Sequence, residues 1–563
     1  MKLDDLKYSN YPNPRFRRKS FTMLNGEWDF AFVDNFKVCD TFDKKIIVPY
    51  PYESLDSGIG DEKNHNYMVY RRYFDIDELC HYILHFEGVD YMCNIFVNGY
   101  LVGSHTGCYS AFCFHLFDQL KMGKNELIVL VYDSFSKHQL RGKQRVREEN
   151  YECWYTQYSG IYKDVYLEKC GDHPISSIKC SGAKDGTFEY DVKLYNPANI
   201  DIIISRLGKT IKTINLHENR SEYIGKSLLN DVDFYDEDTP NLYDVRVISY
   251  GSSEDIVDTY FGFRTIETRN RKIYINDKET YLKMILNQGY YGSKLVSGTK
   301  EEIFNDLCFI KEAGFNGVRV HQKIESNIFY YIADCFGLYL WNEIPSAYEF
   351  NKEMREEYVR ELPRLIAQNY NSPSVIVHLL FNECWGVYKV RDDIETQDFI
   401  HRMNSLCKEN DNTRLVISND GWFQLSDTDI VSLHEYEQNH ETLYKEYKDL
   451  NHVLDENNII NTFGPAMADN NPYLGQPIIL SEFGGAAMKS SNGWGYGDKC
   501  DDIIAYKKQL ENIFDVIYKL DYLSGYCYTQ LCDVQQEVNG LMDEKRHLKL
   551  SIEEYRKIIG RKE

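Results

Sequence analysis

From about residue 272 onward, short apolar runs alternate with amphipathic helical segments, and this alternation restricts the possible folds more than any other feature. Between Thr299 and Gly314, apolar residues recur at helical spacing, with a capping box at the start and a glycine at the end. Eight strand and helix units over roughly 290 residues predict a (β/α)8 barrel. The eight strand-like runs are TYLKMILNQG, NGVRVHQ, GLYLWNEIP, SVIVHLLFNE, TRLVISNDGW, DIVSLHEY, PIILSEFGG and SGYCYTQL.

Two stretches ahead of the barrel have β-type patterns without a helical period. Residues 1–170 contain strand-length runs such as GEWDFAF, CNIFVNGYLVG and NELIVLVYD, and Asn98-Gly99 is a typical hairpin turn. Residues 171–268 continue with TFEYDVKLYN, NLYDVRVISYG and DTYFGFRTIE. We therefore expect two β-sandwich domains, the second one smaller, followed by the barrel domain of residues 269–563.

Composition narrows the classes of partner. The chain is 43% hydrophobic and 27% charged, as packed proteins are, and its formal net charge is -23. That charge repels phosphate backbones and anionic lipid, so we expect neither nucleic acid nor membrane as a partner. The 15 cysteines lack paired or zinc-type spacing, which predicts reduced thiols, and we expect no metal and no cofactor. Without an apolar leader, the chain is predicted to be cytoplasmic, and a homo-oligomer is compatible with the sequence.

Two of the predicted strands end in a glutamate. The fourth run ends in Asn382 and Glu383, and the seventh ends in Ser481 and Glu482. Because the carboxyl ends of barrel strands meet at one mouth, we expect both glutamates at the same site. Neighbouring acids oppose each other's ionisation, so one can stay protonated while the other is charged, and glycosidic cleavage needs that division. For either motif alone, a helix N-cap or a solvated loop is the competing interpretation.

The motifs FNECWG, SEFGG, GFNGVRVHQ, YIADCFGLYLWNEIP and SGIYKDVYLE resemble glycoside hydrolase family 2, which includes β-galactosidases, β-glucuronidases and β-mannosidases. The resemblance extends from about Leu24 to the end of the barrel. It implies a jelly-roll sugar-binding domain, an immunoglobulin-like sandwich and a catalytic (β/α)8 barrel, acting on a carbohydrate with retention of configuration. It also implies that Glu383 is the general acid/base, that Glu482 is the nucleophile and that Asn382 binds the sugar 2-hydroxyl.

Further site candidates follow strands two and six. His434 and Tyr436 end run six, where related barrels place a tyrosine against the nucleophile, and core packing is the alternative. Arg319 and His321 end run two, where a buried arginine would orient Glu482.

Aromatic residues and one further acid complete the predicted site. Trp385 follows the acid, and Trp494 lies after the nucleophile, where it could stack on a sugar face. Glu343 ends run three and is the rival for either catalytic role.

The sugar is left open by the sequence. The family's β-glucuronidases carry an Asn-x-Lys element after strand eight, whereas here Asn539 is followed by Gly540 and Leu541. Lys323 is the candidate cation for a substrate carboxylate, and a surface lysine is the alternative. The motifs are also similar to a compact branch of gut-bacterial β-galactosidase-like and β-galacturonidase-like proteins. A galactoside or a hexuronide is the expected substrate, and a β-glucuronidase or a catalytically weak glycan-binding protein is the alternative.

Overall fold

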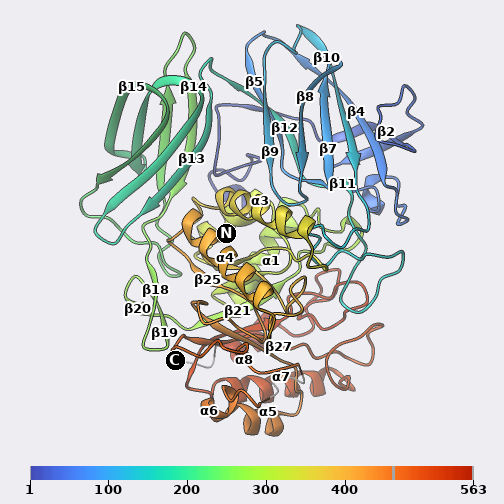
Figure 1. Ribbon diagram of the computed structural model, residues 1–563, viewed down its shortest axis with the longest axis vertical. Helices are drawn as coiled ribbons and strands as arrows, with labels where there is room; N and C mark the ends of the chain where they lie inside the picture. The colour runs from blue at the N-terminus through green and yellow to red at the C-terminus, as the bar shows by residue number, and fades with distance from the viewer. Residues whose placement is uncertain (1, 459–462, 561–563) are drawn as a thin grey trace.

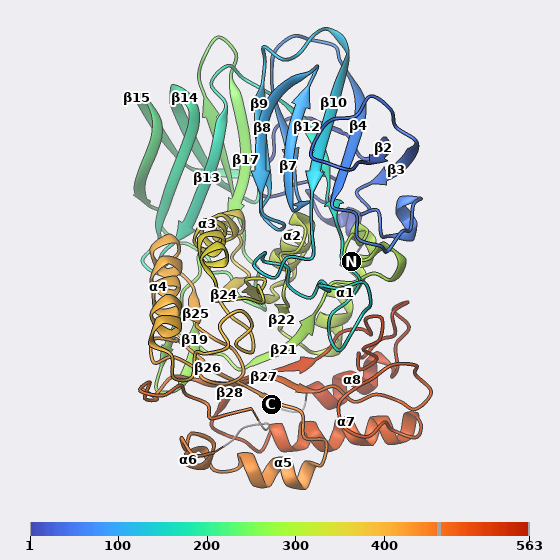
Figure 2. The ribbon, with the colours of Figure 1, turned by 45° about the vertical axis from the view of Figure 1, so that its right-hand side comes forward.

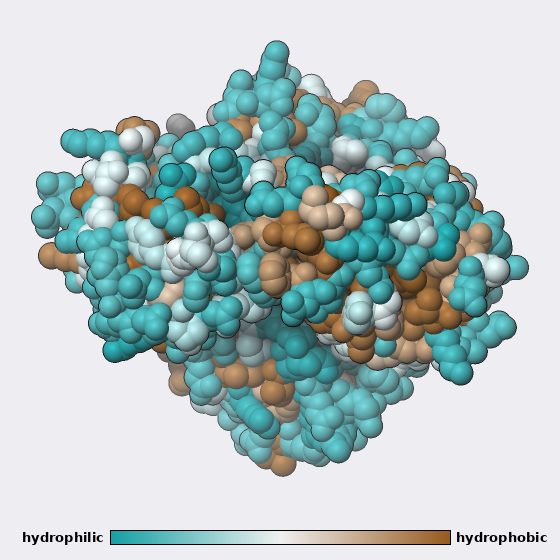
Figure 3. Space-filling model, turned by 90° about the horizontal axis from the view of Figure 1, so that it is seen from above, coloured by the Kyte–Doolittle hydropathy of each residue, from teal (hydrophilic) through white to brown (hydrophobic). Residues whose placement is uncertain are grey.

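The computed structural model describes residues 2–458 and 463–560. Two β-rich regions lie side by side, and both rest on a barrel that forms the opposite end of the molecule (Figure 1, Figure 2). Viewed down on the two β-rich regions, the surface is mostly hydrophilic with scattered apolar patches (Figure 3), in keeping with the net charge of -23. In the described part of the chain, no helix is both long and apolar enough to cross a membrane.

The first region is a sandwich of a six-stranded and a four-stranded antiparallel sheet, with strand orders β3-β2-β4-β10-β7-β8 and β1-β12-β5-β9. Alternation in the sequence produces its core: in β7, Cys93, Ile95 and Val97 are buried, and the residues between them are partly exposed. The strands are β1 (Phe21–Met23), β2 (Gly26–Phe32), β3 (Lys44–Val48), β4 (Tyr67–Ile76), β5 (His81–Phe86), β6 (Val89–Asp90), β7 (Met92–Val97), β8 (Tyr100–Thr106), β9 (Phe112–Leu116), β10 (Gly123–Tyr132), β11 (Gly160–Ile161) and β12 (Val165–Cys170).

The second region is built around a long antiparallel hairpin of two 20-residue strands, β14 and β15. The register of β14 shifts between Lys193 and Ala198, so its first half pairs with β13 and its second half with β16. This bulge lets β14 pair with both β13 and β16, and the strands enclose a common apolar core. The strands are β13 (Ile175–Gly182), β14 (Thr187–Arg206), β15 (Lys209–Leu228), β16 (Tyr243–Ser249) and β17 (Asp255–Phe261).

The third region is the predicted barrel of eight parallel strands, in the order β25-β24-β23-β22-β21-β28-β27-β26. β25 and β26 share no ladder. Instead, Gly421 N–H donates to Ser432 O (3.2 Å) and nearly closes the barrel. Seven of the eight predicted runs contain one of these strands, and the eighth begins one residue after the start of β28. The strands are β21 (Leu282–Asn287), β22 (Gly317–Val320), β23 (Tyr339–Glu343), β24 (Val375–Leu379), β25 (Leu415–Ile417), β26 (Val431–Glu435), β27 (Ile478–Gly484) and β28 (Leu523–Thr529).

Helices surround the barrel strands, and the predicted capping signals are confirmed. Thr299 and Glu302 form a reciprocal capping box, and Gly314 ends the first helix with a φ of 100°. The helices are α1 (Lys300–Ala313), α2 (Asn327–Phe336), α3 (Lys352–Gln368), α4 (Ile394–Asn410), α5 (His440–Tyr447), α6 (Leu450–Val453), α7 (Ile503–Ile517) and α8 (Ile552–Ile559), with 3-10 turns η1 (Leu3–Asp5), η2 (Leu55–Ser57) and η3 (Gly292–Lys294).

One end of the barrel is covered by a small three-stranded sheet, β18 (Ile266–Arg269), β19 (Lys272–Ile275) and β20 (Lys278–Glu279). It directly precedes β21, and its Ile273 and Ile275 join the apolar cluster of the barrel interior. The carboxyl ends of the strands are therefore left for the site. The predicted architecture of two β-sandwiches and a barrel is confirmed, whereas the exact boundaries at residues 170 and 268 stay a prediction.

The loop between β10 and β11, residues 133–159, connects the first sandwich to the barrel. Arg141 N–H donates to Ser346 O (3.0 Å), and Tyr155 OH donates to Glu537 in the loop after β28. The first sandwich thus places a loop at the carboxyl end of the barrel (Figure 2).

We expect Arg18 to contribute strongly to stability. Its guanidinium pairs with Glu168 (2.8 Å) in the first sandwich and Asp255 (2.9 Å) in the second, and all three side chains are at most 2% exposed. Arg18→Met leaves the buried Asp255 without its ion pair and leaves Glu168 with His85 (2.8 Å) as its ion-pair partner, so the free energy of unfolding from urea titration should fall by about 3 to 5 kcal/mol. The control Arg246→Met breaks a half-exposed pair and should cost under about 1 kcal/mol. Equal losses would contradict this role.

Candidate active site

The site is organised around Arg319 on β22, whose side chain is fully buried. Its Nε lies 2.9 Å from Glu343 Oε2, and its Nη1 lies 2.5 Å from Asp420 Oδ2 and 3.0 Å from Glu482 Oε1. A planar guanidinium offers several donors in fixed directions, so one side chain orients carboxylates from three separate segments. The predicted contact between Arg319 and Glu482 is present.

Glu482 lies within β27 and is held at both oxygens. Arg319 pairs with Oε1, and Tyr436 OH donates to Oε2. Burial alone would raise the pKa of Glu482, but the positive charges of His434 and Arg319 outweigh burial and hold the pKa below its usual value. Glu482 is therefore an ionised, oriented carboxylate at neutral pH, as a nucleophile must be.

Glu383 lies in the loop after β24, where Glu383 and Cys384 have φ values of 48° and 61°. Its backbone N–H donates to Asp420 O (2.9 Å), which fixes this turn beside the next strand. Its side chain is 21% exposed, whereas that of Glu482 is 6% exposed. The two glutamates thus occupy different environments, although both reach the same place.

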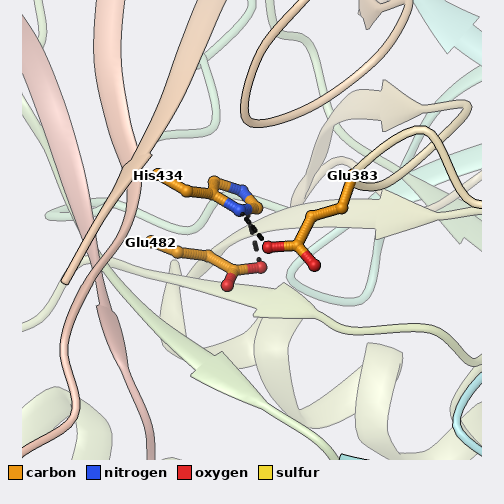
Figure 4. Close-up of side chains that lie close together, drawn as sticks. All are labelled: Glu383, His434 and Glu482. Carbon is orange, nitrogen blue, oxygen red and sulfur yellow. Dashed lines mark hydrogen bonds and ion pairs between the residues drawn. The ribbon is translucent and has the colours of Figure 1, made fainter. Parts of the chain in front are cut away.

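His434 lies between the two glutamates (Figure 4). Its Nδ1 is 2.8 Å from Glu383 Oε1, and its Nε2 is 2.8 Å from Asp420 Oδ2 and 3.5 Å from Glu482 Oε1. One oxygen of each glutamate and one ring nitrogen all lie within 4.8 Å of one another. That spacing is close to the roughly 5 to 5.5 Å between the carboxyl groups of retaining glycosidases.

The charge of His434 follows from these neighbours. Burial would lower its pKa, but the charges of Glu482 and Asp420 raise it to about 10. The ring is therefore an imidazolium at neutral pH. His434, Glu383 and Glu482 are residue types that bind divalent metals, and a metal would have to displace the proton of the ring to bind there.

Asn382 presents a free donor beside this pair. Its Oδ1 accepts from Arg319 Nη2 (2.6 Å), which fixes the amide, and its buried Nδ2 has no hydrogen-bond partner among the described residues. A buried donor without a partner is costly unless a ligand satisfies it. This geometry suits the predicted contact of Asn382 with a sugar hydroxyl.

Glu343, the rival carboxylate, is occupied on both oxygens. Arg319 and His321 contact Oε2, at 2.9 and 3.0 Å, and Gln322 donates to Oε1. Burial would raise its pKa, but Arg319 and His321 lower it to about 2. Glu343 is thus a charged anchor for Arg319 at neutral pH, and His321 contacts both Glu343 and Arg319 (3.2 Å).

The structure does not bring Lys323 into this cluster. Its Nζ donates to Gly289 O (3.0 Å) and pairs with Glu325 Oε1 (3.1 Å), and the side chain is buried. Its charge is therefore already neutralised within the protein. The cause is local, since Gln322 has a φ of 54° and turns the chain between His321 and Lys323.

Aromatic side chains wall the site, and the first sandwich contributes to them. The ring of Trp385 lies 5.4 Å from that of Trp154, and Trp494 Nε1 donates to Glu152 O (2.9 Å). Tyr496 stacks on Tyr436 at 3.4 Å.

Sequence reasoning missed several of these residues. Asp420 ends the fifth run, so the same strand-end criterion that found Glu383 would have found it. Trp154 and Lys143, whose Nζ lies 4.7 Å from the ring of Trp385, come from another domain and carry no signal that links them to the barrel.

Comparison with known families gives matches over most of the chain. Residues 21–170 match the sugar-binding domain of glycosyl hydrolases family 2, and residues 266–561 match the TIM barrel domain of the same family. The barrel match alone covers more than half of the chain.

Curated relatives are distant and longer. A putative β-glucuronidase of Formosa agariphila is 23% identical over 72% of this chain and 50% of its own length. A β-galactosidase of Thermoanaerobacter pseudethanolicus is 24% identical over 69% of this chain and 53% of its own length. The chain spans about half the length of these relatives.

Solved structures share the fold along nearly the whole chain. A family 2 β-galacturonidase of Eisenbergiella tayi, bound to galacturonate, has a TM-score of 0.77 at 18% identity, covering 97% of this chain and 98% of that one. A β-glucuronidase of Bifidobacterium dentium has a TM-score of 0.81 at 18% identity, covering 98% of both chains.

We expect His434 to stay protonated across the neutral range. With histidine labelled at the ring nitrogens, one NMR signal should keep its imidazolium shift from pH 5 to pH 8 and titrate near the pKa of about 10. His434→Asn assigns that signal by removing it, and the exposed-site variant His401→Asn is the control. Titration of the assigned signal near pH 6.5, the ordinary value for histidine, would contradict the charge arrangement.

Proposed function

The chain belongs to glycosyl hydrolases family 2, and on that premise we propose that it is a retaining exo-β-glycosidase that cleaves a terminal β-linked galactoside or hexuronide. The main support is that Glu482, ionised and held by Arg319 and Tyr436, lies close to the more accessible Glu383. This is the arrangement that double displacement needs.

In the first step, Glu482 attacks the anomeric carbon and the glycosidic bond breaks. Glu383 gives its proton to the departing oxygen, so the leaving group departs as an alcohol and a glycosyl ester forms on Glu482. Asn382 Nδ2 would bind the sugar 2-hydroxyl during this step, because Arg319 fixes the amide in that orientation.

In the second step, water cleaves the ester. Esterification removes the negative charge of Glu482, and Glu383 has already given up its proton to the leaving group. Glu383 then takes a proton from the attacking water, and the sugar leaves with its original anomeric configuration. His434 and Arg319 keep their positive charges throughout. These charges stabilise the carboxylate of Glu482 when the ester breaks.

The competing function is a glycan-binding protein on the same fold that has lost turnover. The ionised Glu482, held by Arg319 and Tyr436 close to Glu383, favours the enzyme, since simple binding does not require such a pair. A panel of nitrophenyl β-glycosides of galactose, glucose, mannose, galacturonate and glucuronate tests the choice. Turnover of none of them would favour the binding protein.

Glu482→Gln should abolish formation of the glycosyl ester and leave the fold intact, because an amide cannot supply the attacking oxygen anion. A 2-deoxy-2-fluoro glycoside of the preferred sugar should label the wild-type protein at Glu482, as peptide mass spectrometry would detect. A label on Glu343 would overturn the assignment.

Glu383→Ala should slow the cleavage of poor leaving groups most, because activated aryl oxides depart with little protonation. We expect kcat/KM to fall about 10²- to 10⁴-fold for an alkyl glycoside and much less for the dinitrophenyl glycoside of the same sugar. Equal losses on both substrates would count against the general-acid role.

A further inference from the structure

Glu537, in the loop after β28, is a buried carboxylate that lies outside the Arg319 cluster. Its side chain accepts hydrogen bonds from Tyr155 OH at Oε2 and from Asn539 Nδ2 (3.0 Å) at Oε1, and the residue is 2% exposed. Among the residues that the structure describes, it forms no ion pair. Two neutral donors thus orient a carboxylate whose remaining lone pairs are unused.

Glu537 lies near the two proposed catalytic glutamates, because Lys143 and Tyr496 interact with all three carboxylates. Burial raises the pKa of Tyr496 above its ordinary value, and the charges of Glu537, Glu383 and Glu482 raise it further. The segment that carries Glu537 also pairs with the wall of the site, because Val538 N–H donates to Trp494 O (2.8 Å). Tyr496 therefore lies within electrostatic reach of all three carboxylates.

Two amide oxygens lie next to Glu537 without partners. Gln288, after β21, donates through Nε2 to Tyr155 OH (2.9 Å), and Gln530, after β28, donates through Nε2 to Asn539 Oδ1 (2.7 Å). Both side chains are almost fully buried, and neither Oε1 has a hydrogen-bond partner in the described part of the chain. Because the nitrogens are engaged, both amides are held with the oxygen free.

These groups form an acceptor-rich subpocket at the neighbouring ends of β21 and β28. We propose that Glu537 binds hydroxyl groups of the sugar next to Glu482, and that this subpocket selects a neutral hexose over a hexuronide. Hydroxyl groups can donate to Glu537, Gln288 and Gln530, whereas a carboxylate has no donor and is repelled by Glu537. This inference rests on the proposed glycosidase function.

Lys143 is the one cation that argues for a hexuronide. Its ammonium lies 4.7 Å from the ring centre of Trp385, and it forms no ion pair with any described residue. It offsets only part of the local negative charge, since Glu537 and the ionised Glu482 both lie near enough to raise its pKa against the effect of burial. The acids therefore outnumber this cation, and a further carboxylate would add to the excess.

The test compares kcat/KM for nitrophenyl β-galactoside, its 6-deoxy analogue, β-galacturonide, β-glucoside and β-glucuronide. The wild type should have a higher kcat/KM for the galactoside than for the galacturonide, and a higher kcat/KM for the glucoside than for the glucuronide. Glu537→Gln, which is nearly isosteric, should lower kcat/KM for the preferred neutral hexoside about ten- to a hundredfold, since a hydrogen bond to a charged group is lost. In the same variant, kcat/KM for the matching uronide should fall less or should rise, so the preference for the neutral sugar becomes smaller. A smaller loss on the 6-deoxy analogue would place the contact at the 6-hydroxyl.

Two further variants distinguish selection of a neutral sugar by Glu537 from binding of a uronate by Lys143. Glu544→Gln changes an exposed carboxylate in the same loop and should leave all five values unchanged. If Lys143 instead binds a uronate, the wild type would favour the uronides and Lys143→Met would lower their kcat/KM selectively. That result, or an equal loss on both sugars in Glu537→Gln, would overturn the inference.

If the proposed glycosidase function is wrong, the result differs from the one expected when only this inference is wrong. If no glycoside is turned over, calorimetric titration of galactose, glucose and the matching uronic acids still reports on the subpocket. Tighter binding of a neutral sugar, weakened about tenfold or more by Glu537→Gln, would then support the inference without catalysis. Tighter binding of a uronic acid, or binding that Glu537→Gln leaves unchanged, would contradict it.

Discussion

The ion pairs of Arg319 hold the candidate site together. One buried guanidinium contacts Glu343, Asp420 and Glu482, which lie on or after three different barrel strands. A buried cation of this kind is tolerable only with several partners, and each carboxylate in turn depends on the cation. Both oxygens of Glu343 have partners, so Glu343 anchors the guanidinium. The side chain of Glu482 remains 6% exposed, as a group that contacts a ligand requires. The geometry of Glu482 is thus a property of the barrel rather than of one loop.

The two glutamates show how one site can give similar side chains different chemistry. Glu482 lies within a strand, largely buried, and its pKa is lowered by the charges of His434 and Arg319. Glu383 lies in a loop, more exposed, and contacts His434 from the other side. His434 is buried and charged between them, so it links the two carboxylates electrostatically. A change in the charge of either glutamate is therefore transmitted to the other through a single ring.

Much of the architecture could be predicted because its signals are periodic. Each barrel strand is a short apolar run followed by a polar strand end, and this pattern located Glu383, Glu482, Arg319 and His434. The structure pairs Lys323 with Glu325 outside the Arg319 cluster, because Gln322 has a positive φ that the two-residue spacing from His321 does not reveal. Lys143 could not have been predicted at all, because the fold of the first sandwich alone brings that loop to the barrel.

The loop of residues 133–159 makes the first sandwich part of the site rather than an accessory to it. Tyr155 from this loop orients Glu537, and Lys143 and Trp154 border the barrel opening, whereas Glu383 and Glu482 belong to the barrel. The first sandwich thus adds contacts to a site whose other residues belong to the barrel. Exchange of the first sandwich between family members would alter which sugar fits while leaving the cleavage chemistry in place, so new specificities can arise by recombination as well as by point substitution.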